Sequence, residues 1–217
     1  MSRSSFRQAR FSLVPIADSR YERRSSFPDP MQSGFPSTAP NEEAEMATVS
    51  TTTAGEIIYG GYWPGVIGEI TGLHGVYYRE HWGFDISFEA QVGRELSEFL
   101  RDFRDGRDFF RTARAGNRFA GSIALDGKDA DGKGARLRWY IVAPEFQKLG
   151  IGRRLITDAV EFCRTAGYRR IYLWTFKGLD RARVLYESNG FRLDEEHDVR
   201  QWGNNITEQK FSLEWER

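Results

Sequence analysis

The sequence contains the stretch Val142-Ala143-Pro144-Glu145-Phe146-Gln147-Lys148-Leu149-Gly150-Ile151-Gly152-Arg153-Arg154. An apolar run ends at Val142, Pro144 prevents it from continuing as a strand, and the following loop leads directly into a helical pattern. The first turn of a helix has backbone N–H groups without intrahelical partners and the positive end of the helix dipole, so this junction can bind an anion. Glycine at positions 150 and 152 leaves space for a phosphate group and permits positive φ angles. An ordinary strand–loop–helix connection with two glycines is the alternative interpretation.

Strands and helices alternate on both sides of this junction. Strands are predicted over 136–142, 170–176, 191–195 and 210–215. Apolar residues at steps of three and four predict one helix that ends before Gly167 and another that ends at Asn189–Gly190. Because short connections join these units, we expect a sheet with helices packed on its faces.

The preceding hundred residues predict further strands and helices. Six glycines lie between positions 60 and 75, in a segment that predicts a short strand over 66–69 and then a turn into a helix. An amphipathic helix is predicted over 88–103. Two more strands are predicted over 107–113 and 118–125, before a loop rich in Gly, Asp and Lys. The fold class is therefore α/β, or α+β if these early strands pair as hairpins.

Composition divides the 217 residues into two parts. Five of the seven prolines and ten serines lie in the first fifty residues, which contain too little apolar surface to offset the entropy of ordering. We therefore predict a disordered extension over 1–54 and one folded domain over 55–217. The six Arg and two acidic residues among the first 27 weakly resemble an organellar transit peptide, but a flexible tail or an over-extended start before Met46 is favoured.

Charge and cysteine content exclude several classes of function. The 31 Lys and Arg balance 31 Asp and Glu, which argues against nucleic acid as the main partner. The single cysteine rules out an internal disulfide framework and a Cys-based zinc site, and the three histidines lack ligand spacing, so we expect no metal. No apolar run approaches the roughly 20 residues that span a bilayer, so we expect a cytoplasmic protein without a membrane partner.

Two motifs carry a resemblance to a known superfamily. They are Gln147-x-x-Gly150-x-Gly152, after a strand that ends Val142-x-Pro144, and Ala182-Arg183-Val184-Leu185-Tyr186-Glu187-Ser188-Asn189-Gly190-Phe191. Together they resemble the GNAT superfamily of acyl-CoA-dependent N-acyltransferases, over about Gly55 to the C-terminus. Shorter segments, including 74–80 and 88–92, are similar to the acetyltransferase half of proteins fused to a MarR-type DNA-binding domain, although no such domain precedes them here. The resemblance implies a mixed central sheet with helices on both faces and splayed central parallel strands.

The resemblance also implies acetyl-CoA as cosubstrate and assigns residues to it. In this superfamily the glycine loop wraps the pyrophosphate with backbone N–H groups, and the splayed strand pairs with the pantetheine arm. The matching positions are Ile141, Val142, Gln147, Lys148, Leu149, Gly150, Ile151, Gly152 and Arg153. Tyr186 matches the tyrosine that donates a proton to the departing thiolate. The alternative interpretation is that Tyr186 is only a residue on the apolar face of its helix. Leu179 replaces an asparagine that contacts the coenzyme in many members.

A base must accept a proton from the acceptor amine. An alkylamine with a pKa near 10.4 is almost entirely protonated at pH 7, and only the neutral form attacks a thioester. The resemblance offers Glu80, Glu89, His74 and His81 as candidates. Glu80 and His81 are preferred, and an exposed Glu–His pair on a helix surface is the alternative interpretation.

The acceptor pocket is predicted from aromatic and strand residues. His74 and Tyr77 lie in the segment that forms the acceptor side in the superfamily, and Tyr77 belongs to an aromatic cluster that suits a hydrophobic or cationic amine. Period-two alternation places Arg138 and Tyr140 on one face of the central strand, where they could line the acceptor tunnel. The same alternation turns Trp139 to the opposite face, in the core.

These expectations converge on one function. The chain is predicted to transfer an acetyl group from acetyl-CoA to a primary amine, of a small molecule or a protein, by direct attack in a ternary complex. A non-catalytic CoA-binding sensor is the alternative from a different class. The acceptor remains open, because acceptor loops vary most among enzymes that share a fold, and a homodimer is one expected assembly.

Overall fold

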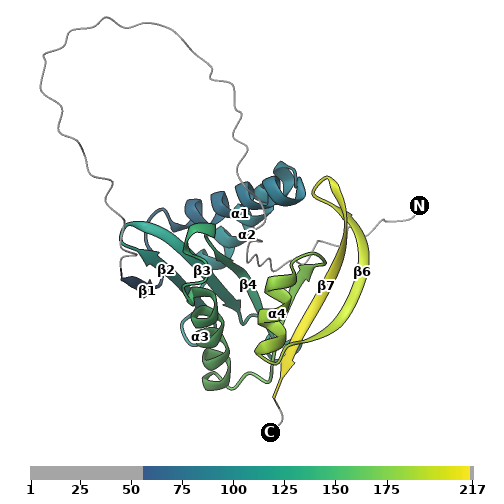
Figure 1. Ribbon diagram of the computed structural model, residues 1–217. Helices are drawn as coiled ribbons and strands as arrows, with labels where there is room; N and C mark the ends of the chain where they lie inside the picture. The colour runs from purple at the N-terminus through teal and green to yellow at the C-terminus, as the bar shows by residue number, and fades with distance from the viewer. Residues whose placement is uncertain (1–55, 216–217) are drawn as a thin grey trace, which may run out of the picture.

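The computed structural model describes residues 56–215, which form a seven-stranded sheet covered by helices (Figure 1). The strands pair in the order β1-β2-β3-β4-β5-β7-β6. Their bounds are β1 Ile57–Gly60, β2 Phe109–Ala115, β3 Arg118–Asp126, β4 Ala135–Val142, β5 Arg170–Phe176, β6 Arg192–Gln201 and β7 Asn204–Glu214. The helices are α1 Val66–Trp82, α2 Ile86–Arg101, α3 Ile151–Thr165 and α4 Asp180–Ser188, with a 3₁₀ turn η1 at Pro144–Phe146. The prediction for residues 1–54 lies outside the described residues.

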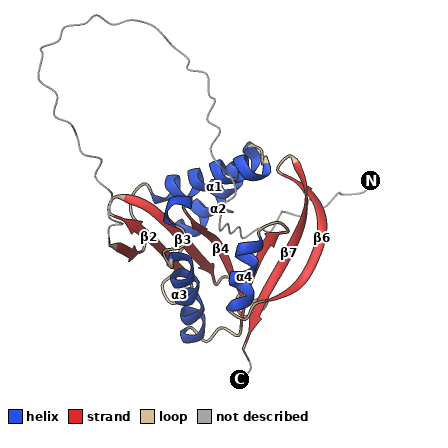
Figure 2. Ribbon diagram, viewed as in Figure 1, coloured by secondary structure: helices blue, strands red, loops and turns tan. Residues whose placement is uncertain are grey.

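Strand directions confirm the predicted mixed sheet. Strands β1 to β4 pair antiparallel, β4 and β5 pair parallel, and β7 pairs antiparallel with both β5 and β6. Helices α1 and α2 lie on one face of the sheet, and α3 and α4 lie on the other (Figure 2). Within residues 56–215, no helix is long and apolar enough to cross a membrane.

The predicted strand over 66–69 is wrong, because these residues begin helix α1. Gly65, with a φ of 100°, precedes the helix, and buried side chains such as Val66 and Ile70 then recur on one helical face. The glycines of α1 allow a close approach to α2: a Cβ atom at Gly75 would lie 2.8 Å from the side chain of Glu89. Packing of the two helices therefore outweighs the low helix propensity of glycine.

The two predicted C-terminal strands are the ends of a longer hairpin. Strand β6 pairs with β7 along most of its length, and the chain reverses at Trp202 and Gly203, both at positive φ. Most side chains of β6 are exposed and charged or polar, so its sequence lacks the apolar alternation that identifies a strand.

The central strands β4 and β5 part after a short contact. Their parallel pairing joins Ala135 to Ile171 and Arg136 to Tyr172, and no further pair follows. Each strand keeps its other neighbour, since β4 stays paired with β3 as far as Val142 and β5 pairs with β7 along its whole length. The predicted splay is confirmed, and it leaves one backbone edge of β4 without a strand partner.

A bulge in β4 reverses the predicted facing of its side chains. Trp139 has a φ of 43°, and the register with β3 shifts at this point. As a result Arg138 and Trp139 both turn toward α2, where they contact Glu95 and Phe99, while Tyr140 turns toward α3. The prediction that Arg138 and Tyr140 share a face is therefore wrong, because an extra residue breaks the period of two.

We predict that the hydroxyl of Ser122 holds this bulge. It is fully buried and donates a 2.7 Å hydrogen bond to the Trp139 carbonyl. Ser122→Ala should lower the free energy of unfolding by about 1–3 kcal/mol, measured by urea denaturation, because a buried carbonyl loses its donor. Ser97→Ala removes an exposed hydroxyl bonded to the Gly93 carbonyl and should change stability by less than about 0.5 kcal/mol. Equal effects of the two substitutions would contradict this role.

Candidate active site

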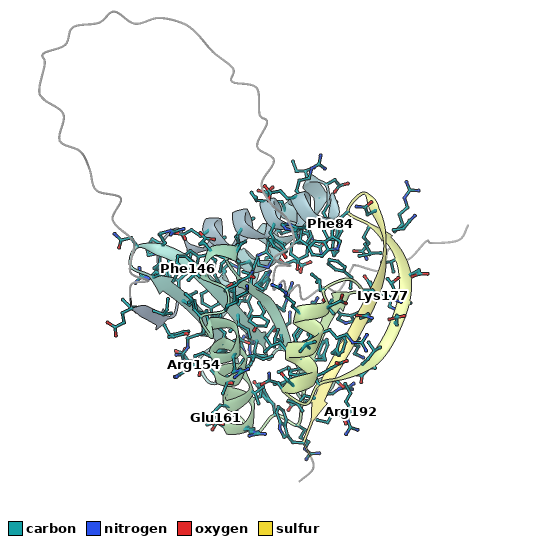
Figure 3. All side chains as sticks on the ribbon, viewed as in Figure 1. Phe84, Phe146, Arg154, Glu161, Lys177 and Arg192 are labelled. Carbon is teal, nitrogen blue, oxygen red and sulfur yellow. The ribbon has the colours of Figure 1, made fainter. Side chains whose placement is uncertain are left out.

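The glycine loop joins β4 to α3 at the open end of the splay. The side-chain amide of Gln147 donates to the Val142 carbonyl at 3.2 Å, which ties the loop to the end of the strand. Lys148 and Gly150 have φ angles of 65° and 80°, so the chain turns sharply before α3. Figure 3 shows Phe146 beside this loop and Arg154 on α3.

The first turn of α3 presents free backbone donors. The first intrahelical bond runs from the Arg154 N–H to the Gly150 carbonyl at 3.0 Å, so the N–H groups of residues 151–153 have no partner inside the helix. No side chain caps this end. A Cβ atom at Gly150 would meet no other heavy atom within 4 Å, so the space beside the loop is open. This end of α3 can therefore hold an anion such as a pyrophosphate.

Gly152 is required for a different reason than Gly150. A Cβ atom at Gly152 would lie 2.8 Å from the hydroxyl oxygen of Tyr140. The glycine therefore makes room for a buried tyrosine of β4, and not only for a ligand.

Charged side chains beside the loop fall into two groups. Arg154 pairs with Asp158 at 2.8 Å and lies over the ring of Tyr59. Lys148 and Arg153 are exposed and form no ion pair within residues 56–215, so both remain available to phosphate oxygens. Leu149 is 49% exposed and packs on no part of the core.

Three buried tyrosines from different elements lie close together. Tyr186 of α4, Tyr140 of β4 and Tyr78 of α1 are fully buried, and their hydroxyl groups have no hydrogen-bond partner. Burial raises the pKa of all three phenols, and the proximity of Tyr140 and Tyr78 raises the pKa of Tyr186 further. Tyr186 therefore stays protonated at neutral pH and can act as a proton donor, but not as a base.

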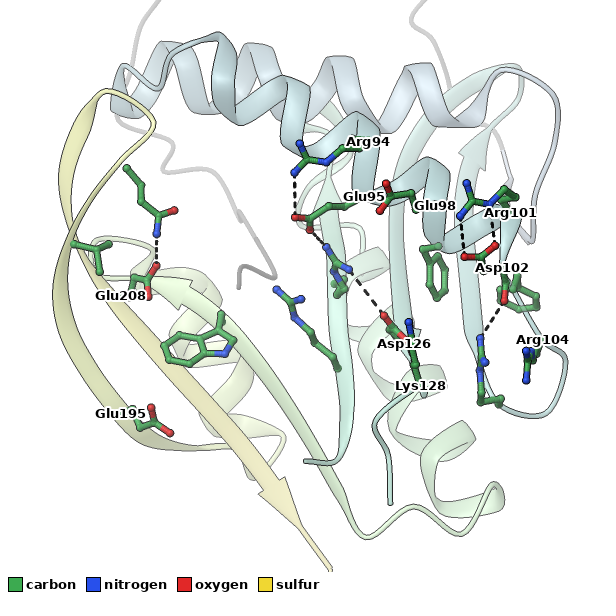
Figure 4. Close-up of a pocket in the computed structure, with 18 of the residues that line it drawn as sticks. Arg94, Glu95, Glu98, Arg101, Asp102, Arg104, Asp126, Lys128, Glu195 and Glu208 are labelled. Carbon is green, nitrogen blue, oxygen red and sulfur yellow. Dashed lines mark hydrogen bonds and ion pairs between the residues drawn. The ribbon is translucent and has the colours of Figure 1, made fainter. Parts of the chain in front are cut away.

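A large cleft lies on the opposite face of the sheet, between α2 and the β6–β7 hairpin (Figure 4). Its volume is about 1520 Å³. Arg136 and Arg138 of β4 and Trp174 of β5 line it from the sheet, and Glu95 and Phe99 line it from α2. Its wall carries carboxylates and guanidinium groups together, so it suits a polar or charged molecule.

The predicted pair Glu80 and His81 lies away from this cleft. Both side chains are exposed near the end of α1 and neither lines the cleft. The ring of His81 stacks on Tyr77 at 4.2 Å and bonds to the Tyr77 carbonyl at 2.8 Å. His74 is buried within α1, where its Nδ1 atom lies 2.7 Å from the Ile70 carbonyl. The structure brings none of these groups to the cleft wall.

Sequence reasoning missed a carboxylate that does line the cleft. Glu208 of β7 is 6% exposed, and one carboxylate oxygen lies 3.0 Å from Nε2 of His197 on β6. Its other oxygen accepts a 3.0 Å hydrogen bond from the side chain of Gln201. Burial raises the pKa of Glu208 to about 7, although His197 and Gln201 lower it. A carboxylate with this pKa can accept a proton near neutral pH. No motif signalled it, because its strand was not predicted at this position.

The sequence also matches a model of a protein family. The profile that describes the Acetyltransferase (GNAT) family matches residues 73–191, which is more than half of the chain. The chain belongs to the GNAT acetyltransferase family. Enzymes of this family are N-acetyltransferases that use acetyl-CoA and act on amine acceptors. No curated protein matches the chain in sequence.

Solved structures share the GNAT fold at low sequence identity. An acetyltransferase from Streptococcus agalactiae is 21% identical, with a TM-score of 0.60 over 73% of this chain and 98% of that chain. The protein yncA from Salmonella typhimurium, solved with its cofactor acetyl-CoA, is 12% identical, with a TM-score of 0.55 over 73% of this chain and 93% of that chain. The spermidine/spermine N-acetyltransferase SpeG from Vibrio cholerae is 18% identical, with a TM-score of 0.53 over 73% of this chain and 95% of that chain.

The residues of this GNAT domain fit an acyl-CoA. The open space beside Gly150 and the donors of residues 151–153 suit its pyrophosphate. The free edge of β4 suits an extended amide-bearing arm, and the unpartnered hydroxyl of Tyr186 suits its sulfur end. Within residues 56–215, no group of three or more His, Cys, Asp or Glu could hold a metal ion.

We predict that Gly152→Ala weakens acetyl-CoA binding by displacing Tyr140. Acetyl-CoA at 100 times its dissociation constant should stabilise the native protein by about 2.7 kcal/mol, and this gain should largely disappear in the variant, measured by thermal melting.

The double variant Gly152→Ala, Tyr140→Phe is the matched control. Without the hydroxyl, the nearest ring carbon lies 3.7 Å from the new methyl group, so most of the gain should return. A double variant as impaired as Gly152→Ala alone would show that the methyl group blocks the coenzyme directly.

Proposed function

We propose that this GNAT protein transfers an acetyl group from acetyl-CoA to a primary amine by direct attack in a ternary complex. The splay between β4 and β5 supports this proposal most, because it separates a coenzyme site at α3 from a cleft at α2 by a single strand layer. When bound, acetyl-CoA supplies a thioester whose carbonyl carbon accepts the amine nitrogen as the carbon–sulfur bond breaks. The free backbone edge of β4 orients the coenzyme and can donate N–H groups to its carbonyl oxygen.

Tyr186 is the proposed acid. Its hydroxyl is buried beside β4 and stays protonated, so it can donate a proton to the sulfur of the leaving group. The hydroxyl also has no partner in the protein, which leaves its hydrogen free for this role.

Glu208 is the proposed base, in place of Glu80 and His81. It lines the cleft and its raised pKa lets it accept the proton that the ammonium group of the acceptor must lose. Glu95 also lines the cleft, but its carboxylate is already paired with Arg138 and Arg94.

We predict that Tyr186→Phe lowers kcat by roughly 100-fold while the affinity for acetyl-CoA changes less than about 3-fold. The hydroxyl forms no hydrogen bond in the native protein, so its removal should leave the melting temperature unchanged or higher. Turnover is followed by thiol release over a panel of amines. A parallel loss of turnover and coenzyme affinity would argue against the acid role. Coenzyme binding without thiol release from any amine would favour a sensor instead.

We predict that Glu208→Gln removes a titration near pH 7 from the dependence of kcat/KM on pH. The base must be deprotonated to act, so kcat/KM of the unsubstituted protein should rise as the pH increases through 7. The variant should lose this rising limb of the pH profile. The free energy of unfolding should change in the opposite direction to kcat/KM. Because burial raises the pKa of Glu208, the unsubstituted protein should become less stable relative to the variant as the pH rises from about 4.5 to 7. Glu98→Gln, at an exposed carboxylate of the same cleft, should retain the limb. A limb that survives in Glu208→Gln would exclude this base.

A further inference from the structure

Two arginines of β4 line the floor of the cleft and differ in their partners. Arg138 pairs with Glu95 of α2 and lies 3.9 Å from Asp126 of β3, so carboxylates on two elements neutralise it (Figure 4). Its guanidinium also lies 4.0 Å from the centre of the Trp139 ring. Arg138 is therefore fixed by the fold itself.

Arg136 has no such partners. It forms no ion pair within residues 56–215, and its Nε and Nη2 atoms are buried without a hydrogen-bond acceptor. The nearest carboxylates, Glu95 and Asp126, are already engaged by Arg138. Arg136 lines the cleft, and Nη1 is the guanidinium nitrogen through which it can contact a molecule there.

A partly buried cation whose Nε and Nη2 atoms lack a hydrogen-bond acceptor is unfavourable for the fold. Burial and the neighbouring charge of Arg138 together lower the pKa of Arg136 to about 9. Even so, the guanidinium stays charged at neutral pH, and electrostatic interactions with Tyr172, Glu95 and Asp126 offset the lowering of its pKa only in part. Removal of a charge of this kind commonly stabilises a protein, so its presence calls for an external anion.

We propose that Arg136 binds an oxyanion, a carboxylate or a phosphate, that belongs to the amine acceptor. The inference rests on the proposed function, because it places the acceptor in this cleft. A guanidinium N–H donates a charge-assisted hydrogen bond to either oxyanion, and Nη1 of Arg136 is the nitrogen that can do so in this cleft.

The spacing along β4 sets the length of the acceptor. Arg136 lies four residues before Tyr140. A regular strand of this length would rise roughly 3.3 Å per residue, or about 13 Å, and the bulge at Trp139 shortens this distance. Allowing for the reach of the arginine side chain, the amine nitrogen and the oxyanion should lie on the order of 10 Å apart. The acceptor class is therefore an amine with a distant acidic group, such as the N-terminus of a short peptide.

The experiment uses two matched pairs of probes in isothermal titration calorimetry with the full-length protein, without coenzyme. Triglycine is compared with triglycinamide, and 6-aminohexyl phosphate is compared with 6-aminohexanol. We expect the anionic member of at least one pair to bind at least 10-fold more tightly, and the pair with the larger ratio identifies the oxyanion. Equal affinities within both pairs would overturn the proposal.

Two variants test the residue. Arg136→Met should abolish the preference for the anionic probe while its melting temperature rises or stays unchanged, because a buried unpaired charge is removed. Arg94→Gln removes an exposed guanidinium from the wall of the same cleft and should keep the preference. A preference that survives in Arg136→Met, or that is lost equally in both variants, would overturn the assignment.

Acetyl-CoA binding distinguishes a failure of this inference from a failure of the proposed function. Thermal stabilisation by acetyl-CoA is measured on the same preparations and does not depend on the acceptor cleft. If acetyl-CoA stabilises the protein but no oxyanion preference is seen, only the inference on Arg136 fails. If acetyl-CoA gives no stabilisation, the proposed function fails whatever the probes show.

Discussion

The separation of β4 from β5 is the constraint on which the rest of the structure depends. Backbone groups that lack a partner are costly when buried, and two parallel strands would normally satisfy one another along their whole length. Here the two strands share pairs only at their first residues, and each is held in place by its outer neighbour. Aromatic rings of α1 and β5, including Tyr78 and Phe176, pack on one side of the gap. The fold thus keeps open a strip of polar backbone that a bound chain can complete.

The same gap divides the chemistry of the site between two faces. On one face, the helix dipole and free N–H groups of α3 attract an anion, and burial keeps Tyr186 protonated. On the other face, burial raises the pKa of Glu208 toward neutrality, and carboxylates alternate with guanidinium groups along the cleft. Burial therefore supplies both an acid and a base, because the phenol and the carboxylate begin from different intrinsic pKa values.

Sequence patterns predicted the elements of the coenzyme side well. Strand β5 was predicted at its observed bounds, since a continuous apolar and aromatic run is typical of a buried strand. The end of α3 at Gly167 was also predicted, because a glycine at positive φ is a local requirement of a helix terminus. The start of α1 and most of the β6–β7 hairpin were not, because packing between α1 and α2 overrides glycine propensity and an exposed polar strand has no periodic signal.

The sequence alone determined the glycine loop, the helix end beside it and the family, because these depend on residues that are neighbours in the chain. Only the tertiary structure showed that a bulge turns Arg138 and Tyr140 to opposite faces. It alone brought Glu208 next to His197, and it alone left Arg136 without a counter-ion while Arg138 took both nearby carboxylates. Ion pairing and burial depend on groups that are distant in sequence, so no pattern within one segment can specify them.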